Sequence, residues 1–354
     1  MTKSPLASHR AAALTGDARV PGDKSISHRA LMIGAMAVGE TAVSGLLEGE
    51  DVLRTAAAMR LLGARVERDE PGRWRIHGCG IGGLKEPDDI LDMGNAGTGA
   101  RLLMGLLATH PFTSVLTGDA SLRSRPMQRV MEPLGRIGAR FVARSRSRLP
   151  LAMTGAATPL PIRYEMPVAS AQVKSAILLA GLNTPGDTVV VEPVPSRDHT
   201  ERMLRGFGVD VQVETAGTGR VITLRGQPEI TGRSVTVPGD PSSAAFLAVA
   251  AAIVPGSALT LRNVGINPLR YGLFQTLMEM GADITPVNVR DQSGESTADL
   301  KVRHGSLTGV DVPAARAPSM IDEYPILAMA AACASGTTRM FGLSELRVKE
   351  SDRL

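Results

Sequence analysis

The chain repeats itself, and this self-similarity constrains its fold more than any other feature. A helix-like stretch followed by a glycine turn and a short strand occurs four times. The turn glycines lie 75, 70 and 73 residues apart and are Gly63, Gly138, Gly208 and Gly281. Each follows an apolar run with helical spacing, where the C-terminus of a helix favours a left-handed residue. The repeat therefore predicts four helices that end at these glycines.

A second element alternates with the first and consists of a helix rich in small residues, a turn and a strand. Its copies begin near Ser25, Asn95, Ser170, Ser242 and Ser319. Together the two elements form a unit of roughly 72 residues that contains two helices and several strands. Alternating helices and strands indicate an α/β fold built from repeated units.

The repeat also bears on the end of the chain. A further helical element begins at residues 347–354, and the sequence stops there before any terminal glycine turn. Half a repeat leaves an apolar face uncovered, because each repeat buries its face against its neighbours. A natural C-terminal helix is the alternative. The count of elements favours a truncated chain.

Composition excludes several classes of protein. At 354 residues, with 43% hydrophobic and 21% charged residues, the chain is long enough for roughly two domains and is not disordered. Its two cysteines, Cys79 and Cys333, exclude a disulfide scaffold, a cysteine-rich zinc site and an iron–sulfur cluster, and they fit a reducing compartment. The N-terminal 20 residues lack the apolar core of a signal peptide, and no uninterrupted run of 18 apolar residues occurs. We therefore expect a cytoplasmic protein with no membrane partner.

The charged residues do not indicate a nucleic-acid partner. The net charge is +4, and the basic residues are scattered along the chain apart from a group at 136–148. Ten aromatic residues are too few for a platform that stacks single-stranded bases. Arginine far outnumbers lysine, which fits anionic small substrates, although a GC-rich genome gives the same bias.

Polar clusters mark the starts of the predicted helices. The first, PGDKSISHRA at 21–30, combines Lys24 and Arg29 with Ser25 and Ser27, two candidate capping residues. A helix N-terminus beside such cations is an anion site, whereas a capped helix with solvated cations is the plainer alternative. The segment does not match the Walker motif, because Asp23 precedes the lysine.

Further clusters recur at equivalent places in the repeat. They are the glycine-rich 94–103, the segment 123–126 in which Arg125 is expected to open a helix, 170–174, 196–201, the acidic pair within 318–325, and 347–354. Each is weak alone, and surface ion pairs explain 347–354 equally well. Stacked repeats aim equivalent helix N-termini to a common side. The clusters therefore predict a site for a substrate with several phosphate and carboxylate groups.

Eight ordered motifs resemble the family of 5-enolpyruvylshikimate-3-phosphate synthase, or 3-phosphoshikimate 1-carboxyvinyltransferase, over nearly the whole chain. They are GDKSISHRA, GNAGTGARLL, TGDASLRSRPM, SAQVKSAILLAGL, RDHTERML, PGDPSSAAF, PSMIDEYP and RVKESDRL. The resemblance implies the enolpyruvyl transferase fold, a two-domain inside-out α/β barrel of βαβαββ units with the active site between the domains. Residues 22–240 would be a complete three-unit domain. Residues 1–21 with 241–354 would be a discontinuous domain that lacks its second half.

The resemblance also implies a reaction, the transfer of the enolpyruvyl group of phosphoenolpyruvate to the 5-hydroxyl of shikimate 3-phosphate with release of phosphate. This step leads to chorismate and the aromatic amino acids. The residues implied to bind shikimate 3-phosphate are Lys24, Ser25, Arg29, Ser170, Gln172, Arg197, Asp322 and Lys349. Those implied to bind phosphoenolpyruvate are Lys24, Gly97, Arg125, Gln172 and Arg353.

Three residues are implied to be catalytic. Asp322 would accept the proton of the hydroxyl, and Glu350 and Lys24 are the candidates for proton transfer at C3 of phosphoenolpyruvate. The resemblance implies no metal and no cofactor, and a monomer, since the family is usually monomeric. SAQVK and RDHTE are similar to the bacterial subgroup noted for weak inhibition by glyphosate, although Leu269 departs from its usual pattern.

Two alternatives stay open from the sequence. One is the related transferase that acts on UDP-N-acetylglucosamine, which typically uses a loop cysteine, whereas no cysteine lies between Cys79 and Cys333. The other is an inactive truncated fragment that binds shikimate 3-phosphate through 22–240. Phosphate release in the presence of both substrates separates these alternatives.

Overall fold

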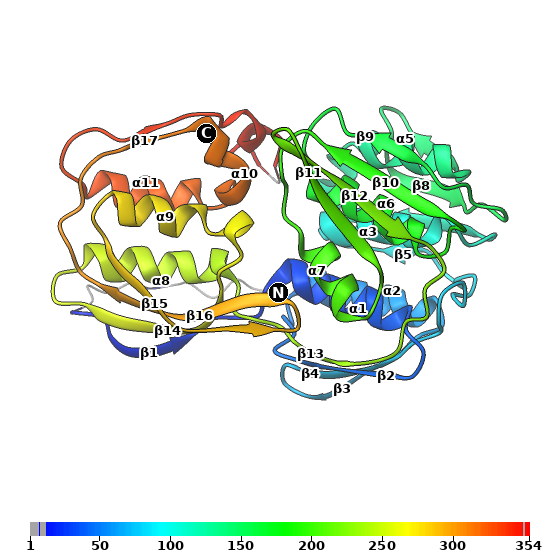
Figure 1. The fold of residues 1–354 in the computed structure, drawn as a ribbon, viewed down its shortest axis with the longest axis horizontal. Helices are drawn as coiled ribbons and strands as arrows, with labels where there is room; N and C mark the ends of the chain where they lie inside the picture. Colours follow the sequence, from blue (N-terminus) through cyan, green and yellow to red (C-terminus); the bar gives the residue numbers. More distant parts are fainter. Residues whose placement is uncertain (1–6, 8–11, 350) are drawn as a thin grey trace. The chain divides into compact units, whose positions relative to one another are not determined.

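The chain folds into two compact units, each described here by itself. The structure is a computed structural model that describes residues 7, 12–349 and 351–354, apart from the side chain of Val348. Unit 2 comprises Pro21–Pro238 with Asp291–Ser296, and unit 1 comprises Met1–Val20, Gly239–Arg290 and Thr297–Leu354. Figure 1 labels the elements of both units along the chain.

Unit 2 contains three four-stranded sheets. Its strands are β2 (Glu40–Ser44), β3 (Arg65–Glu70), β4 (Arg73–His77), β5 (Leu91–Asp92), β6 (Thr113–Thr117), β7 (Arg140–Arg144), β8 (Arg148–Thr154), β9 (Arg163–Glu165), β10 (Asp187–Glu192), β11 (Val211–Ala216), β12 (Gly219–Arg225) and β13 (Ser234–Thr236). The strand orders are β13-β2-β4-β3, β5-β6-β8-β7 and β11-β12-β10-β9. Each sheet has one parallel pair, which is β13 with β2, β5 with β6 or β9 with β10, and its other strands pair antiparallel.

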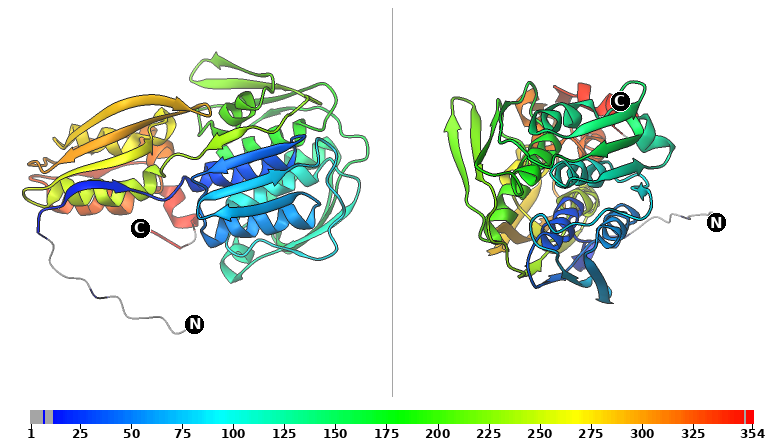
Figure 2. Two further views of the ribbon diagram at one scale, coloured as in Figure 1. Left: turned by 90° about the horizontal axis from the view of Figure 1, so that it is seen from below. Right: turned by 90° about the vertical axis from the view of Figure 1, so that its right-hand side faces the viewer.

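The three sheets of unit 2 enclose its helices (Figure 2). They are α1 (Lys24–Ala35), α2 (Glu50–Leu61), α3 (Gly97–Leu107), α4 (Ala120–Ser124), α5 (Gln128–Ile137), α6 (Ala171–Gly181) and α7 (His199–Gly206). The right-hand view of Figure 2 shows the sheets on the outside and the helices between them. Nearly every residue of α1, α3 and α6 is buried, which explains why these helices are rich in small apolar residues.

The helices α3 and α6 approach each other closely. A Cβ atom on Gly105 would lie 2.3 Å from the carbonyl oxygen of Ala176, so only glycine fits at this crossing. This contact joins the second and third units of the repeat. The beginnings of both helices carry residues that the resemblance assigns to substrate.

Unit 1 has its own core and a sheet of the same design. Its strands are β1 (Thr15–Arg19), β14 (Ala258–Gly265), β15 (Asp283–Gln292), β16 (Glu295–Arg303), β17 (Asp311–Val312) and β18 (Arg339–Met340). Its helices are α8 (Pro241–Ile253), α9 (Gly272–Glu279), α10 (Ala317–Met320) and α11 (Tyr324–Ala332), with the short 3-10 turns η1 (Pro268–Arg270), η2 (Ala314–Arg316) and η3 (Ser344–Val348). One sheet has the order β1-β14-β16-β15, and the other pairs β17 with β18 in parallel.

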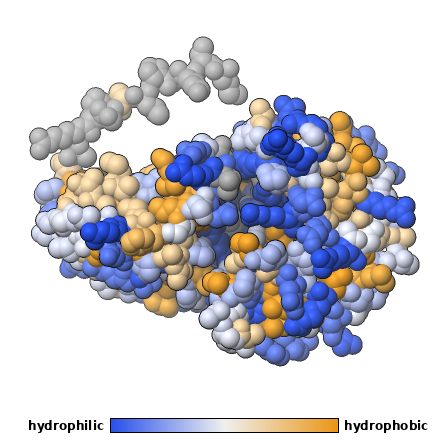
Figure 3. Space-filling model, turned by 90° about the horizontal axis from the view of Figure 1, so that it is seen from above, coloured by the Kyte–Doolittle hydropathy of each residue, from blue (hydrophilic) through white to orange (hydrophobic). Residues whose placement is uncertain are grey.

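The predicted glycine turns are confirmed. Gly63, Gly138, Gly208 and Gly281 have φ values of +98°, +119°, +88° and +98°, the left-handed region that glycine adopts without strain. The alternation of helices and strands is observed in both units. Within the described ranges, no helix is long and apolar enough to cross a membrane. On the face of unit 2 seen at the right of Figure 3, hydrophilic side chains are interspersed with hydrophobic ones.

Candidate active site

The first polar cluster opens α1, but its cap differs from the prediction. Asp23 is the N-cap, and its Oδ1 accepts a hydrogen bond from the backbone N–H of Ile26 at 2.9 Å. The prediction that Ser25 and Ser27 cap this helix is therefore wrong. Ser27 is buried, and its hydroxyl accepts a hydrogen bond from Leu47 N at 3.0 Å. The helix begins at Lys24, because an aspartate directly before it is as good a cap as serine.

The two cations of this cluster have different environments. Lys24 is half exposed, and its Nζ lies 3.3 Å from Asp51 Oδ2. Arg29 is only 2% exposed and donates to Thr200 Oγ1 and Ser175 Oγ, both at 2.7 Å. Burial lowers the pKa of Arg29 to about 10, while nearby carboxylates raise it. It remains a cation at neutral pH, held by hydroxyl groups.

His28 lies between these two cations in sequence and is fully buried. Its Nδ1 is 2.8 Å from the hydroxyl oxygen of Thr55. Burial, together with the charges of Lys24 and Arg29, lowers the pKa of His28 to about 3. This histidine is therefore neutral and adds no positive charge to the site.

The glycine-rich cluster opens α3. Gly97 is the first residue of that helix, and a Cβ atom there would lie 2.7 Å from Arg125 Nη1 and 3.3 Å from Arg101 Nη1. Arg125 donates a short hydrogen bond to Asn95 Oδ1 and another to Ser121 Oγ at 3.1 Å. The glycine thus lets two guanidinium groups approach the start of a helix, which suits the binding of an anion.

Arg125 does not open a helix, contrary to prediction. It is the C-cap of α4 with φ −82° and ψ 137°, and α5 begins three residues later at Gln128. The reason is Pro126, because a residue that precedes proline is driven away from the helical region. The extended backbone is the conformation in which Arg125 reaches Asn95.

Hydrogen bonds connect α3 with the start of α6. Gln172 donates through Nε2 to Thr98 Oγ1 at 2.9 Å and accepts from Arg101 Nη1 through Oε1 at 3.0 Å. Ser170 is the N-cap of α6, where its hydroxyl accepts from Val173 N. Arg101 Nη1 also donates to the carbonyl oxygen of Gly97 at 3.4 Å, so it links Gly97 with Gln172, and Arg125 lies beside Gly97. Thr98 and Arg101, which both bond to Gln172, were not among the predicted site residues.

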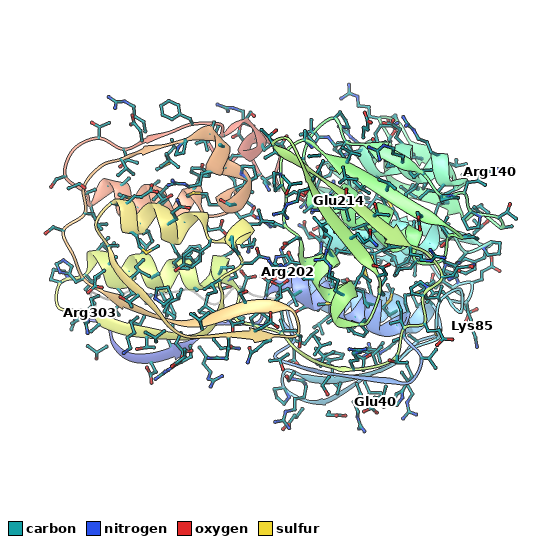
Figure 4. The ribbon with its side chains drawn as sticks, in the orientation of Figure 1. Glu40, Lys85, Arg140, Arg202, Glu214 and Arg303 are labelled. Atoms are coloured by element: carbon teal, nitrogen blue, oxygen red, sulfur yellow. The ribbon has the colours of Figure 1, made fainter. Side chains whose placement is uncertain are left out.

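Arg197 precedes α7, whose N-cap is Asp198. Arg29 donates to Thr200 in the first turn of this helix, so both of these predicted ligands of one substrate lie at its start. Asp198 accepts from Nε of Arg202, which is labelled in Figure 4, at 2.8 Å. The N-terminal turn of α7 is thus held by its own side chains.

In unit 1, two cations contact the predicted proton acceptor. Asp322 lies between α10 and α11, and its Oδ1 is 3.2 Å from Lys349 Nζ and 3.3 Å from Arg353 Nη1. The helix expected to start within 347–354 is absent from the described part of the chain, which has only the turn η3 there. Glu350, the other predicted catalytic carboxylate, lies outside the described residues.

A buried arginine beside Asp322 was missed from the sequence. Arg270 is 4% exposed and donates from Nη2 to Ser242 Oγ at 2.7 Å and to Asp240 Oδ1 at 3.3 Å. Its Nη1 lies 3.5 Å from Glu323 Oε1 and 3.9 Å from Asp322 Oδ2. Residues 267–270 contribute only Leu269 to the sequence-based predictions, although an arginine in an apolar context is itself a signal.

Unit 2 has a polar cavity of about 330 Å³ next to the glycine-rich cluster. Its lining residues include Asn95, Asp119, Arg54, Asp92 and Arg123. Among the described residues, no group of three or more His, Cys, Asp or Glu side chains could hold a metal ion.

The comparisons with known proteins agree with one another. The family model of EPSP synthase (3-phosphoshikimate 1-carboxyvinyltransferase) matches residues 9–354. The 3-phosphoshikimate 1-carboxyvinyltransferase of Paramagnetospirillum magneticum is 70% identical over 351 residues, which are 99% of this chain and 79% of the relative. The enzyme of that name from Rhodospirillum rubrum is 64% identical over 99% of this chain and 79% of its own length.

Solved structures show the same fold. EPSP synthase from Acinetobacter baumannii superposes with a TM-score of 0.87 at 50% identity, over 96% of this chain and 76% of that one. The enolpyruvyl transferase NikO from Streptomyces tendae, at 19% identity and a TM-score of 0.73, shares the fold over 94% of this chain and 76% of its own. The α/β enolpyruvyl transferase-type fold is thus confirmed.

Two further expectations can be compared with these matches. The prediction that the second half of the discontinuous domain is missing is not supported by the family model, which matches through residue 354. The UDP-N-acetylglucosamine transferase is not favoured, because the family model and the curated relatives agree on the shikimate enzyme. The ordered motifs, the family model and the relatives together confirm that this chain belongs to the EPSP synthase family of 3-phosphoshikimate 1-carboxyvinyltransferases.

Proposed function

We propose that this chain catalyses the reaction of its family, the transfer of the enolpyruvyl group of phosphoenolpyruvate to the 5-hydroxyl of shikimate 3-phosphate. Identity of 64–70% to relatives named for that activity supports the assignment. In the reaction the hydroxyl oxygen bonds to C2 of phosphoenolpyruvate while C3 gains a proton. Loss of phosphate and of one C3 proton then restores the double bond.

Unit 2 supplies the greater part of the anion-binding residues. Its proposed ligands of shikimate 3-phosphate are Lys24, Ser25, Arg29, Ser170, Gln172 and Arg197, and its proposed ligands of phosphoenolpyruvate are Lys24, Gly97, Arg125 and Gln172. The start of α3 supports the second set, because two guanidinium groups flank a helix N-terminus at a glycine. Arginine is suited to phosphate and carboxylate, since its planar fork donates two parallel hydrogen bonds.

Unit 1 supplies the proposed proton acceptor, and one observation carries this part of the proposal. Lys349 and Arg353, which we assign to shikimate 3-phosphate and phosphoenolpyruvate, both contact the carboxylate of Asp322. The two ion pairs hold the carboxylate in place, and a carboxylate in reach of the 5-hydroxyl can accept its proton. When anionic substrates engage the cations, the carboxylate is released to act as a base. For proton transfer at C3 we propose Lys24 and Glu350.

The two compact units also have a place in the proposal. We propose that the two units are the two domains of the inside-out barrel, with boundaries near residues 22 and 240. The βαβαββ order of the sheets in unit 2 supports this. A cytoplasmic location, a monomeric state and a subgroup of weak glyphosate inhibition stay predictions.

One experiment separates turnover from mere binding. Phosphate release is followed with the 354-residue protein, both substrates and each substrate alone, alongside calorimetric titration with shikimate 3-phosphate. Release that requires both substrates supports the proposal. Binding without release would favour the alternative of an inactive binding protein.

A matched pair of variants then tests the role of Asp322. Asp322→Asn should abolish release, because an amide cannot accept the proton. Asp311→Asn, an exposed carboxylate paired with Arg339 on the β17–β18 sheet of the same unit, should leave it unchanged. Equal rates of phosphate release for Asp322→Asn and the wild type would show that Asp322 is not the proton acceptor.

A further inference from the structure

Lys174 on α6 is among the largest fully buried side chains of the described structure. Its exposed fraction is 0%, and it lies one turn after Ser170, the N-cap of its helix. A buried ammonium group loses its hydration, so it is retained only where close partners replace the water. The residue falls in the SAQVK motif, but the proposed function gives it no role.

The ammonium group has three acceptors. It donates to Glu192 Oε1 and to the carbonyl oxygen of Ser196, both at 3.2 Å, and lies 2.7 Å from Glu201 Oε1. Both carboxylates are also buried, at 1% and 2% exposed. Three donors of the ammonium therefore meet three acceptors from three different segments, β10, α7 and the loop between them.

The same cluster holds Ser196 at every polar group. Ser196 N and Oγ donate to Glu192 Oε2 at 3.2 Å and 2.7 Å, while its carbonyl accepts from Lys174. The backbone on both sides of this residue is fixed by buried charges. Arg197 is the next residue, so the cluster fixes the backbone from which the Arg197 side chain extends.

The cluster also reaches Arg29. Ser175, which follows Lys174, shares a hydrogen bond of 2.7 Å with Thr200, and both hydroxyls accept from Arg29. Thr200 directly precedes Glu201, which lies 2.7 Å from the Lys174 ammonium. Two proposed ligands of shikimate 3-phosphate therefore depend on one buried lysine.

We propose that Lys174 is a positioning residue that holds Arg197, through Ser196 and Glu192, and Arg29, through the neighbouring hydroxyls of Ser175 and Thr200, in the arrangement that binds shikimate 3-phosphate. This inference rests on the proposed function. It predicts that replacing Lys174 weakens the binding of shikimate 3-phosphate more than an equally destabilising change elsewhere in α6 does. Phosphoenolpyruvate should be affected much less, because Gly97 and Arg125 lie outside these hydrogen bonds.

Three variants separate positioning from charge balance and from packing. Lys174→Met keeps the length of the side chain and removes the ammonium. Lys174→Met with Glu201→Gln restores the net charge of the cluster but not the hydrogen bond to Ser196. Leu178→Ala, one turn later on the same helix and equally buried, removes packing alone.

The measurement is the dissociation constant of shikimate 3-phosphate by calorimetry on the 354-residue protein, with a thermal melt of each variant. We expect Lys174→Met and the double variant to weaken binding by about tenfold or more, as the loss of a charge-assisted contact implies. Leu178→Ala should melt at a lower temperature and bind as the wild type does. Binding within twofold of the wild type in either Lys174 variant would overturn the inference.

Failure of a variant to fold and failure of the wild type to bind have different consequences. If Lys174→Met does not fold, Glu192→Gln tests the same cluster, because the single oxygen of an amide cannot accept from both Lys174 and Ser196. Unchanged affinity in that variant would also overturn the inference. If the wild type itself fails to bind shikimate 3-phosphate, the proposed function fails, and the inference with it.

Discussion

A single methyl group at residue 97 tests the proposed phosphoenolpyruvate subsite. In Gly97→Ala the new Cβ atom would lie 2.7 Å from Arg125 Nη1, whereas ordinary contacts are 3.4 Å or longer. The neighbour is the far end of a flexible side chain, so the guanidinium group moves by about 0.7 Å and the fold is kept. Since Arg125 is a proposed ligand, the movement costs binding rather than stability.

The size of the effect follows from the contact that is lost. A hydrogen bond to a charged group contributes about 1.5–3 kcal/mol, and partial adjustment of a flexible arginine favours the lower end. That corresponds to about a tenfold loss of affinity for phosphoenolpyruvate. Affinity for shikimate 3-phosphate should change little, because its proposed ligands at the start of α1 are not displaced.

Gly135→Ala is the matched control. Gly135 lies within α5, and nothing lies within 4 Å of the position of its Cβ. Alanine there should raise stability by about 0.5–1 kcal/mol and leave both affinities unchanged. The assay is the KM for phosphoenolpyruvate from phosphate release at saturating shikimate 3-phosphate. An unchanged KM in a folded Gly97→Ala protein would refute the placement of phosphoenolpyruvate at the start of α3.

Three further changes give distinct results. Lys24→Ala should abolish phosphate release and weaken shikimate 3-phosphate binding by about tenfold or more in calorimetry, while Lys85→Ala, on the surface of the same unit, should do neither. Because burial and nearby charges lower the pKa of His28 from 6.5 to about 3, its contribution to stability is fully present above pH 6.5 and is lost as the pH falls toward 3. Between pH 7 and pH 4 this loss amounts to about 3 kcal/mol, and it should disappear in His28→Gln, measured by urea unfolding at the two pH values. Burial raises the pKa of Asp299, but hydrogen bonds from Asn263 N, the Asn288 amide and Arg262 outweigh it and lower the value to about 2, so this group stabilises unit 1 above about pH 4 and ceases to do so toward pH 2. Asp299→Asn should lower stability at pH 7 by about 2 kcal/mol and much less at pH 2, and equal losses at the two pH values would contradict the assignment.

The periodic features of the fold were predictable because they are local. A glycine after an apolar helical run marks a helix end wherever it occurs, and Gly63 and Gly208 have the left-handed backbone expected of them. The parallel pairing of β1 with β14, in contrast, joins strands more than two hundred residues apart. Nothing in either segment alone specifies its partner.

The site was predictable where a motif is contiguous and less so where contacts span the sequence. Ser170 caps α6 in the way its motif indicates, but Asp23 replaced the expected serine caps because it stands one residue before the helix. The extended backbone of Arg125 could have been predicted from Pro126, which follows it. The contacts of Asp322 with Arg270 and of Lys174 with Glu192 arise only when distant segments pack together.

The central claim is that this chain makes a carbon–oxygen bond between its two substrates, and the fate of a labelled atom tests it most directly. Phosphoenolpyruvate isotopically labelled at C2 is incubated with shikimate 3-phosphate and the 354-residue protein, and the products are resolved by mass spectrometry and NMR. We predict that the label appears in an enol ether at the 5-oxygen of shikimate 3-phosphate, with one phosphate released for each label transferred. Label that stays in phosphoenolpyruvate, or that is recovered as pyruvate without transfer, would contradict the claim.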